Sequence, residues 1–431
     1  MHEITPKIKK AILVAVSLPG EKEVTESSVK ELELLAQTLE IDVVDTIIQS
    51  RLKVHNVHYV GKGILEKLAL LVEELDVQIV ICDDELTPSQ QKNIQRGLDD
   101  CEVLDRSSLI LDIFNEHAKT NEAKTQVGLA RMEYMLPRLS RKWTHLERQK
   151  GGIDIRGGPG ETQIEVDRRL IRNQIKKLKV QLQKIELQGE TQNKHRSQHF
   201  NVAIVGYTNA GKSTLMNIIT FAEVAVEDKL FKTLDTTIRK CEIDKSHIIF
   251  LSDTVGFIRK LPHQLVASFR STLKEVESAD LLLKVIDISD LNFLQHIKTI
   301  DDELKAFKIP KKNFINIYNK VDMISDYLNI EMIKKQLSDG IFISAKRDLG
   351  IEKLLLEIKK RMDQNSHQRT IRISNTDGKA NSAIYQFGKI IDQKFEDDFT
   401  EYKVDMRNAM FEKFSKEYKI TIVSENNFDG S

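Results

Sequence analysis

One stretch, Asn201–Thr214, constrains what this chain can fold into more than any other. It reads Asn-Val-Ala-Ile-Val-Gly-Tyr-Thr-Asn-Ala-Gly-Lys-Ser-Thr and contains the pattern Gly-x-x-x-x-Gly-Lys-Ser. The apolar, β-branched run Val202–Val205 predicts a buried strand, and Thr214–Ile219 predicts a helix. A strand, a glycine-framed loop and a helix in this order form a phosphate-binding loop, because the loop amides and the helix N-terminus then point at an anion. These flanking elements argue against a chance match in a glycine-containing turn.

The residues of this loop are candidates for contact with a nucleotide. Glycine at Gly206 and Gly211 lets the backbone pass close to phosphates without a Cβ in the way. Lys212 can reach the terminal phosphates, and the hydroxyl of Ser213 can ligate Mg²⁺. The candidate binding residues here are Gly206, Tyr207, Thr208, Asn209, Ala210, Gly211, Lys212 and Ser213.

A second motif, Asp253-Thr254-Val255-Gly256, follows the expected strand His247–Leu251. An aspartate at the carboxyl end of a buried strand is well placed to hold Mg²⁺ through water. Gly256 leaves its backbone amide free for a γ-phosphate. We therefore expect Asp253, Thr254, Val255 and Gly256 to line the same nucleotide site.

Two further motifs indicate that the base is guanine. Asn319-Lys320-Val321-Asp322 follows the expected strand Phe314–Ile317. A carboxylate at Asp322 can accept from the ring N–H and the exocyclic amine of guanine together, a donor pair that adenine lacks. Ser344-Ala345-Lys346 follows the expected strand Ile341–Ile343, where a backbone amide could meet the guanine oxygen. Alone, the first of these motifs could be an ordinary helix cap, but the ordered set at successive strand ends argues for a guanine nucleotide site.

These motifs predict a doubly wound α/β sheet that binds its ligand at the carboxyl ends of the strands. We assign it to residues 200–364, as a P-loop GTPase domain. A polar linker, Asp363–Arg369, leads into residues 365–431, which are expected to form a small α/β domain. In that domain we expect a strand at Ile371–Ser374, a helix through Ile391, a strand near Tyr402–Val404 and a charged helix through Tyr418.

Residues 1–118 are predicted to form another α/β domain, with a parallel sheet, because strands and helices alternate along it. Strands are expected at 10–17, 43–49, 59–60, 77–82 and 101–105, and helices at 24–39, 64–75, 89–98 and 107–117. Gly61-Lys62-Gly63 opens a helix and could bind a phosphate, although a tight turn is the favoured interpretation. Asp83-Asp84-Glu85 follows a buried strand and is interpreted as a solvated helix entry.

Residues 119–199 are predicted to form an antiparallel helical hairpin. Apolar residues at alternating spacings of three and four give two coiled-coil-type seams, broken by the glycine-rich segment Gly151–Gly160 as a tip. The seams are Leu129, Met132, Leu136, Leu139, Trp143 and Leu146, then Ile164, Ile171, Ile175, Leu178, Leu182 and Ile185. Pro137 should kink the first helix.

The hairpin is basic. Between Arg131 and Arg196 there are sixteen Lys and Arg against eight Asp and Glu, a local net charge of +8. The basic residues near the tip are Arg141, Lys142, Arg148, Lys150 and Arg156, and those on the return helix are Arg168, Arg169 and Arg172. They could form a solvated coiled-coil exterior. The sharper hypothesis is a basic prong that follows the phosphate backbone of RNA, with glycines at the tip that allow close approach.

Composition restricts the remaining function classes. The 431 residues suit two to four domains, and Lys plus Arg equals Asp plus Glu at 65 each, so net charge alone indicates no polyanion partner such as DNA. Cys82, Cys101 and Cys241 have no metal-ligand spacing, so a reducing cytoplasm is the simplest compartment. Met1–Lys10 lacks a signal-peptide core, and no apolar run approaches the roughly 20 residues that span a bilayer. We expect a cytoplasmic monomer without a transmembrane segment.

With these residues in view, the chain resembles the bacterial HflX-type GTPases, a translation-factor-related family, over nearly its whole length. The segments that carry the resemblance are Gly157-Gly-Pro-Gly-Glu161-Thr-Gln-Ile-Glu165-Val-Asp167-Arg168-Arg169, Leu86-Thr-Pro-Ser-Gln90, Asp105-Arg106 and Leu136-Pro-Arg138-Leu. Two positions depart from the family, Gly128 where Glu is usual and His117 where Arg is common.

The resemblance implies Mg²⁺-dependent GTP binding and hydrolysis to GDP, together with association with the large ribosomal subunit and its RNA. The family is linked to splitting or rescuing stalled ribosomes under stress. By motif position, Thr233 in Phe231-Lys232-Thr233-Leu234-Asp235 matches the switch threonine that ligates Mg²⁺ when GTP is bound. The catalytic candidates are Lys212, Thr233 and Gly256, and the metal ligands are Ser213 and Thr233.

Two hypotheses concern the rate of hydrolysis. Phe257 stands where Ras-like enzymes place the glutamine that orients water, and phenylalanine cannot orient water by hydrogen bonding. Intrinsic turnover should then be slow and depend on the ribosome. Asn209 occupies the loop position that some GTPases use to hold K⁺, which can substitute for an arginine finger.

Three alternatives remain at this stage. A tRNA-modification-type GTPase shares the loop pattern and the missing glutamine, but it usually needs a reactive C-terminal cysteine, and no cysteine follows Cys241. An RNA-binding module with a vestigial GTPase is disfavoured because Lys212, Ser213, Thr233 and Asp253 are all intact. An additional ATP site in residues 1–118 stays open.

Overall fold

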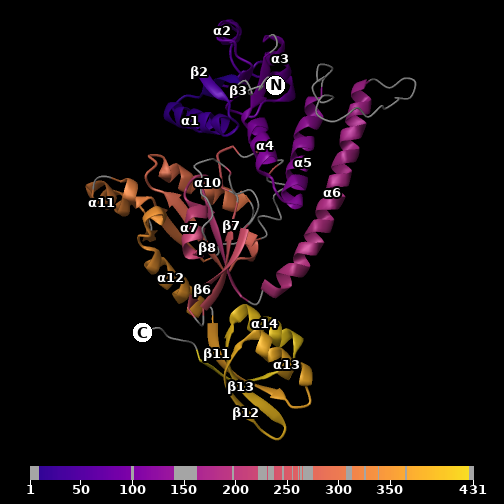
Figure 1. Ribbon diagram of the computed structural model, residues 1–431, viewed down its shortest axis with the longest axis vertical. Coiled ribbons are helices and arrows are strands. Elements are labelled where there is room, and N and C mark those ends of the chain that lie inside the picture. Colours follow the sequence, from indigo (N-terminus) through magenta and orange to yellow (C-terminus); the bar gives the residue numbers. More distant parts are fainter. Residues whose placement is uncertain are drawn as a thin grey trace, which may run out of the picture.

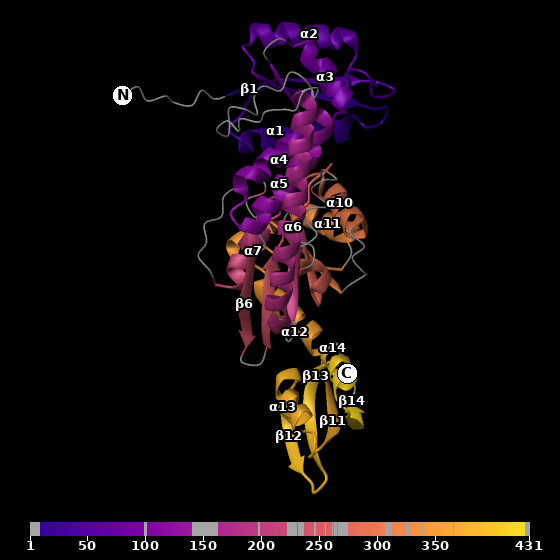
Figure 2. The same cartoon turned by 90° about the vertical axis from the view of Figure 1, so that its right-hand side faces the viewer.

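Three β-sheets with their helices follow one another along an elongated molecule (Figure 1; Figure 2). The N-terminal part lies at one end, the six-stranded nucleotide sheet in the middle and the C-terminal part at the other end. The computed structural model describes residues 9–98, 101–139, 163–196, 199–221, 231, 237–244, 247–254, 256–260, 262, 265, 275–306, 313–324, 327–337, 339–364 and 366–426. None of the helices within these ranges is long and apolar enough to cross a membrane.

The N-terminal sheet has the strand order β2-β1-β3-β4 and is parallel throughout, as predicted. Its elements are β1 Lys10–Ser17, α1 Lys22–Thr38, β2 Asp42–Ser50, α2 Lys62–Glu74, β3 Ile79–Cys82, α3 Pro88–Arg96, β4 Glu102–Asp105 and α4 Arg106–His117. The central strand β1 is a continuous apolar run because both faces of the sheet are covered. Leu13 faces the layer of α1 and α4, whereas Val14 faces the layer of α2 and α3.

One predicted strand of this part is absent. Tyr59 pairs with His55 in an isolated bridge that closes a turn at residues 56–58, and Val60 lies in a bend. Tyr59 has a positive φ of 65°, which a strand does not allow. Its hydroxyl donates to Asp84 at 2.6 Å, so a side-chain hydrogen bond replaces the ladder that the apolar pair suggested.

The helical hairpin consists of α5 Asn121–Met135, a 3₁₀ turn η1 Leu136–Arg138 and the long helix α6 Gln163–Arg196. Helices α5 and α6 run in opposite directions side by side (Figure 1; Figure 2). Leu129 and Ile171 of the predicted seams are buried. Pro137 lies in the 3₁₀ turn after α5 has ended, so it terminates the helix instead of kinking it. The tip Gly151–Gly160, its basic residues, Trp143 and Leu146 lie outside the described residues.

The nucleotide sheet has the order β10-β9-β8-β5-β7-β6. All neighbouring strands in it are parallel except β6 and β7, which form the predicted antiparallel pair. Its elements are β5 Phe200–Gly206, α7 Lys212–Ile219, β6 Thr237–Asp244, β7 His247–Asp253, β8 Leu281–Asp287, α10 Phe293–Ala306, β9 Phe314–Asn319, η3 Val321–Met323, α11 Tyr327–Gln336, β10 Ile341–Phe342, η4 Ala345–Arg347 and α12 Ile351–Gln364. The carboxyl ends of β5, β7, β9 and β10 therefore meet at one edge of the sheet.

The C-terminal part is an antiparallel sheet of order β12-β13-β11-β14 with two helices packed on one face. Its elements are β11 Ser366–Ser374, α13 Gly378–Phe387, β12 Lys389–Phe395, β13 Phe399–Arg407, α14 Asn408–Glu417 and β14 Thr421–Asn426. This βαββαβ succession is the ferredoxin-like arrangement. The expected helix through Ile391 was wrong beyond Phe387, because Gly388 ends it and a strand follows. Strands β12 and β14 were not predicted.

The core of the C-terminal part gives a stability prediction. Phe414 is fully buried and packs against the rings of Phe387 and Tyr418, with centroids 5.1 and 4.9 Å away. Phe414→Ala should destabilise residues 366–426 by roughly 3–5 kcal/mol, because the lost burial leaves a cavity. Hydrogen exchange of peptides from this part measures the change without requiring two-state unfolding of the whole chain.

The matched control for this substitution is Phe395→Ala. Phe395 belongs to the same sheet but is 77% exposed, so the change should stay within about 0.5 kcal/mol. Equal acceleration of exchange in the two variants would contradict the assignment of Phe414 to the core.

Candidate functional site

Two glycines shape the phosphate loop Gly206–Ser213 between β5 and α7. Gly211 has φ +90°, and a Cβ there would collide with the Asn319 side-chain amide. A Cβ on Gly206 would collide with the backbone carbonyl of Val285 in β8. Glycine is required at both positions, because the loop passes so close to neighbouring strand ends. The loop residue Asn209 also has a positive φ, of 58°.

Lys212 is the buried cation of the loop. Its ammonium donates to the carbonyls of Gly206 at 3.2 Å and Tyr207 at 2.8 Å. Burial lowers the pKa of Lys212 to about 8, although the nearby Asp253 carboxylate partly opposes this. A buried ammonium at this place can contribute a full charge to phosphates only while it stays protonated.

Ser213 and Asp253 bring together the oxygens that a magnesium ion would need. The Ser213 hydroxyl donates to Asp253 Oδ2 at 2.7 Å, and Asp253 is almost completely buried at the end of β7. The neighbouring Thr254 hydroxyl donates to the Ile204 carbonyl at 2.7 Å and thereby ties β7 to β5. Hydroxyl and carboxylate oxygens suit Mg²⁺, which usually keeps water and phosphate oxygens as its other ligands. Among the described residues no cluster of three His, Cys, Asp or Glu could hold a metal alone.

Asn319 connects the phosphate loop to the expected base loop. Its side-chain amide donates to the Ala210 carbonyl at 2.8 Å, and its Oδ1 accepts from the Ala345 backbone N–H at 3.0 Å. Ser344 is fully buried, and its hydroxyl accepts from the Arg347 backbone at 3.1 Å. The two guanine motifs predicted from the sequence are thus joined to each other and to the loop.

The other residues of these motifs lie at the same edge. Lys320 has φ +64° and forms an ion pair with Asp287 at 2.7 Å. The Asp322 side chain is 9% exposed and lies 3.7 Å from the Arg347 guanidinium. The Val321 backbone N–H donates to the backbone carbonyl of Ile343, which directly precedes Ser344. An acidic side chain kept within reach of the base loop can accept from a guanine edge.

The segment Gly256–Lys260 lies directly on the phosphate loop. Thr208 N–H donates to the Phe257 carbonyl at 2.9 Å, and Phe257 N–H donates to the Gly206 carbonyl at 3.0 Å. The Phe257 side chain is buried in a cluster with Val205, Val276 and Leu282 among others. It belongs to the core of the domain, which agrees with the argument that it orients no water.

Part of the expected site lies outside the described residues: Lys232, Thr233, Leu234, Asp235 and Val255. Phe231 is described. It is buried, and its ring packs edge-on against Phe114 of α4, with centroids 4.5 Å apart. The Phe231 side chain therefore packs against the helix layer of the N-terminal sheet.

The largest departure from expectation is the carboxylate cluster after β3. Asp83 is 1% exposed and binds Arg106 at 2.8 Å and Lys260 at 2.6 Å. Burial alone would raise the pKa of Asp83, but Arg106 and Lys260 together lower it below its ordinary value. The interpretation of Asp83–Glu85 as a solvated helix entry is therefore wrong for Asp83, whereas Glu85 is exposed, and α3 begins only at Pro88, capped by Thr87.

Other residues that the sequence did not single out also reach the phosphate loop. The Tyr207 hydroxyl donates to Glu31 of α1 at 2.6 Å, and its ring stacks on His296 with centroids 4.0 Å apart. Burial raises the pKa of Tyr207, and the Glu31 carboxylate raises it further. In the sequence, only Tyr207 inside the loop and the Asp105-Arg106 pair pointed toward these contacts. Neither spacing nor composition indicates which residues Tyr207 and Arg106 contact.

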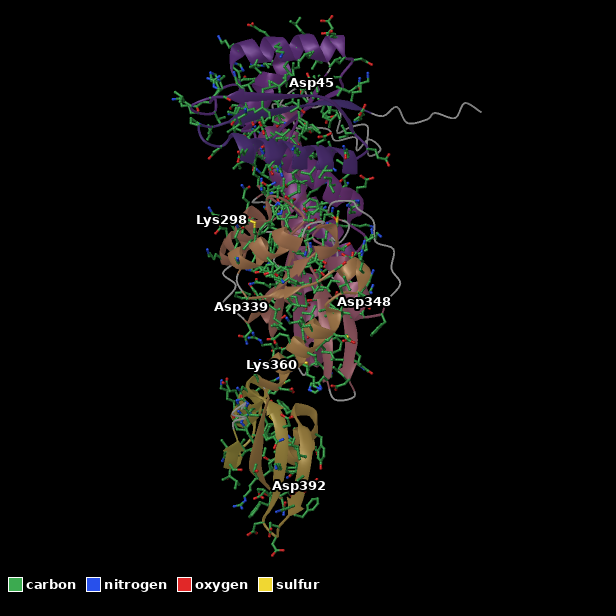
Figure 3. All side chains as sticks on the ribbon, turned by 90° about the vertical axis from the view of Figure 1, so that its left-hand side faces the viewer. Asp45, Lys298, Asp339, Asp348, Lys360 and Asp392 are labelled. Carbon is green, nitrogen blue, oxygen red and sulfur yellow. The ribbon has the colours of Figure 1, made fainter. Side chains whose placement is uncertain are left out.

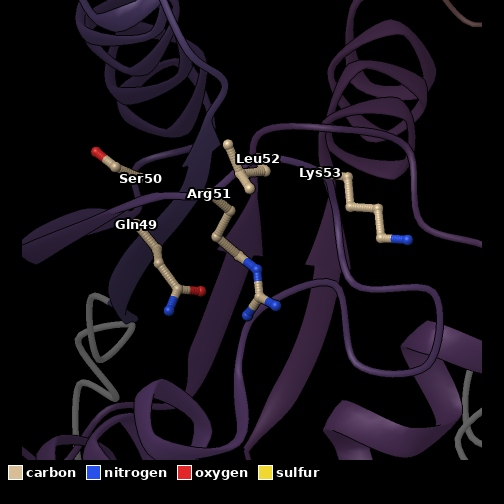
Figure 4. Close-up of a pocket in the computed structure, with 5 residues that line it drawn as sticks. All are labelled: Gln49, Ser50, Arg51, Leu52 and Lys53. Carbon is tan, nitrogen blue, oxygen red and sulfur yellow. The ribbon is translucent and has the colours of Figure 1, made fainter.

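A pocket of about 440 Å³ lies at the carboxyl end of β2, lined by Gln49–Lys53 (Figure 4). The Gly61 amide beside it donates to Gln49 Oε1 at 2.9 Å, and a Cβ on Gly61 would approach the Arg51 guanidinium to 2.6 Å. Gly61 is the extended N-cap of α2, and Lys62 and Gly63 already lie in the first turn of that helix.

The fold and the arrangement of its motifs define the class: a P-loop GTPase with a guanine-type base motif. Residues 26–115 match the family described as GTP-binding GTPase N-terminal, residues 117–196 match GTP-binding GTPase Middle Region, and residues 201–320 match 50S ribosome-binding GTPase. The chain belongs to the HflX GTPase family and hydrolyses GTP.

Relatives and a solved structure show the extent of the similarity. The chain is 40% identical to GTPase HflX of Magnetococcus marinus, over 90% of either chain, and 39% identical to that of Escherichia coli, over 90% of this chain and 91% of the other. It is 49% identical to GTPase HflX of Flavobacterium psychrophilum over 75% of this chain and 78% of the other. A Sulfolobus solfataricus GTP-binding protein solved with GDP is 25% identical, covers 82% of this chain with 98% of its own, and has a TM-score of 0.43.

The buried state of Lys212 gives a prediction about pH. Its pKa is about 8 in the free protein, and contact with phosphates should raise it, so nucleotide binding above pH 8 takes up a proton. GDP affinity should be constant below about pH 7 and fall as the pH rises through 8, by up to about tenfold per pH unit. Calorimetry at pH 8.5 in two buffers of different ionisation enthalpy measures the proton uptake directly.

Lys212→Arg is the control, because guanidinium does not titrate in this range. Any GDP binding that this variant keeps should show no proton uptake. Zero uptake in the unmodified protein would contradict the assignment.

Proposed function

We propose that the protein is a cytoplasmic, monomeric factor that binds the large ribosomal subunit through its basic hairpin and, under control of GTP, splits or rescues stalled ribosomes under stress. The observation that carries this proposal is the exposed basic stripe on α6, the helix that leads directly into the phosphate-loop strand β5. The match of residues 201–320 to the family described as 50S ribosome-binding GTPase supports the partner.

The basic stripe follows from helix geometry. Arg168, Arg172 and Lys176 are spaced by four residues and are exposed, so they lie along one side of α6. Arg169 is exposed beside them. A row of cations on a 34-residue helix can follow a phosphate backbone, and each contact releases a counterion. The stripe is therefore suited to rRNA without any reading of base sequence.

Residue roles at the nucleotide site belong to the same proposal. Lys212 and the loop amides hold the β- and γ-phosphates, and Gly256 offers its amide to the γ-phosphate. Ser213 and Thr233 would ligate Mg²⁺ directly, and Asp253 would hold the ion through a water molecule. The ion would neutralise charge during phosphoryl transfer. Asp322 and the Ala345 amide select guanine. Tyr207, Thr208, Asn209, Phe231, Lys232, Leu234, Asp235, Lys320, Val321 and Lys346 complete the binding surface.

Sedimentation tests the ribosome proposal. Ribosomes are centrifuged with the protein and GTP, a slowly hydrolysed GTP analogue or GDP. Dissociation into subunits is expected only with GTP or its analogue. Binding that does not depend on the nucleotide, or no binding at all, would refute the proposal.

Charge reversal tests the stripe within the same assay. The triple substitution Arg168→Glu, Arg169→Glu and Arg172→Glu should weaken ribosome binding roughly tenfold or more and reduce the slope of log affinity against log salt by about 2–3. An equal change of charge at Lys335, Lys353 and Lys360, all exposed on α11 and α12, serves as the control and should have little effect. Equal losses in both variants would mean that net charge, not the stripe, drives binding.

Turnover provides another prediction. With its side chain in the core, Phe257 orients no water at the phosphate loop, so GTP hydrolysis should be slow in the isolated protein. Ribosomes should accelerate it by at least roughly tenfold; a group supplied in trans gives about 10³–10⁵ in other P-loop enzymes. Steady-state phosphate release with and without ribosomes measures this, and equal rates would overturn the idea.

The same assay in K⁺ and Na⁺ salts tests the proposed role of Asn209 in holding K⁺. Equal rates of GTP hydrolysis in the two salts would remove that role.

A further inference from the structure

The junction between the nucleotide sheet and the C-terminal part contains a histidine that lies between two carboxylates. His247 begins β7, and its Nδ1 lies 2.7 Å from Asp244 Oδ1 at the end of β6. Its Nε2 lies 3.0 Å from Asp363 Oδ1 in the last turn of α12. The His247 side chain is only 18% exposed. One imidazole ring therefore joins the β6–β7 hairpin to the end of α12.

Both ring nitrogens of His247 have to donate in this arrangement. Ionised carboxylate oxygens only accept hydrogen bonds, and only the imidazolium form of histidine carries a proton on each ring nitrogen. In either neutral tautomer, one ring nitrogen would present its lone pair to a carboxylate oxygen. Partial burial would lower the pKa of His247, but the hydrogen bonds with Asp244 and Asp363 outweigh burial and raise the pKa above its ordinary value. The ring is charged below this raised pKa and neutral above it.

The two carboxylates that face the ring depend on His247 to different degrees. Asp244 also accepts from the His247 backbone N–H at 3.0 Å, and its other oxygen accepts from Lys359 Nζ of α12 at 2.8 Å. Lysine stays charged near neutral pH, so Asp244 keeps these two donors when the imidazolium loses its proton. Among the described residues, His247 is the one hydrogen-bond donor to Asp363, whose side chain is 60% exposed. Loss of the proton therefore releases Asp363 in preference to Asp244.

Asp363 lies where its attachment affects the C-terminal part. It is the penultimate residue of α12, and α12 leads directly into β11 of the C-terminal sheet. The two parts also touch through Arg407 at the end of β13, whose Nη1 lies 2.9 Å from Asp280 Oδ2. An ion pair with partly exposed side chains is a weak restraint by itself. The orientation of the C-terminal part therefore depends on a fixed end of α12.

We propose that His247, Asp244 and Asp363 form a pH-sensitive latch that sets the orientation of the C-terminal part. Protonated His247 holds the end of α12 on the β6–β7 hairpin and keeps the C-terminal part in the position that Figure 1 and Figure 2 show. As the pH rises through the pKa of His247, Asp363 is released and the last turn of α12 loses its attachment. The C-terminal part then reorients about the connection between α12 and β11. This latch goes beyond the proposed ribosome function and does not depend on it.

A pair of fluorescent dyes reports this orientation in the full chain. Asp339 of the nucleotide part and Asp392 of β12 are both exposed (Figure 3), and Asp339→Cys with Asp392→Cys provides the two attachment sites, since the three native cysteines are buried. The distribution of single-molecule transfer efficiencies should be narrow at about pH 6 and should broaden or shift at about pH 9. The midpoint of this transition should coincide with the pKa of His247, measured by NMR of the histidine ring signals. The same distribution at both pH values would overturn the proposal.

Two variants of the latch should give different pH profiles. His247→Gln cannot carry the charge, so the distribution should be broad at every pH. Asp363→Ala should also give a broad distribution at every pH, and it should lower the pKa of His247 because one of the two carboxylates is lost. A transition that survives in His247→Gln with its midpoint unchanged would contradict the latch, as would an unchanged pKa of His247 in Asp363→Ala.

Two controls separate the latch from other charged groups near the junction. Burial, together with the charges of Arg407 and Lys240, lowers the pKa of His199, so this histidine titrates below His247. His199→Gln should therefore leave the transition in place. Glu352→Ala removes an exposed carboxylate from the first turn of α12, at the opposite end from Asp363, and should also be silent. Loss of the transition in either control would mean that pH acts through another group and would refute the proposal.

Discussion

The nucleotide site depends on the close approach of Asn319 to the phosphate loop. One amide group joins two strand ends, since Asn319 donates to Ala210 and accepts from Ala345. The approach is possible only because Gly211 has no Cβ and adopts a left-handed conformation. The phosphate loop and the loop expected to meet the base are thereby fixed relative to each other. Such preorganisation lowers the entropy that binding would otherwise lose.

A second constraint acts at the interface with the N-terminal part. Arg106 is a buried charge whose removal would take a cationic partner from both Asp83 and Glu31, and breaking a buried pair is far more destabilising than the pair is stabilising. Burial raises the pKa of Glu31 even though Arg106 and the Tyr207 hydroxyl oppose it. The polar network can persist there because each partner is fixed by its neighbours. Its contacts join α1, β3 and α4 to the phosphate loop and to the segment that follows β7.

Much of the fold could be predicted because local sequence patterns indicate its strands and helices. Continuous apolar strands such as β1 indicated a parallel sheet with both faces covered, and the six-stranded sheet followed from motifs at successive strand ends. The misses share a physical cause. Tyr59 forms no strand because it closes a turn by pairing with His55 and has a positive φ, against its β-propensity. Strand β12 follows the helix directly after Gly388, and only its pairing with β13 distinguishes it from a helical continuation.

The sequence by itself predicted the chemistry of the nucleotide site, because a phosphate loop, a metal-binding carboxylate and a guanine motif each require particular residue types within a few positions of one another. It also determined the basic character of α6, which needs only helical spacing. Only the tertiary structure decided that Asp83 is buried, that Tyr207 points at Glu31 and that Lys260 bridges two parts of the chain. Those contacts join residues more than a hundred positions apart, and their energies depend on burial and orientation, which no local pattern encodes.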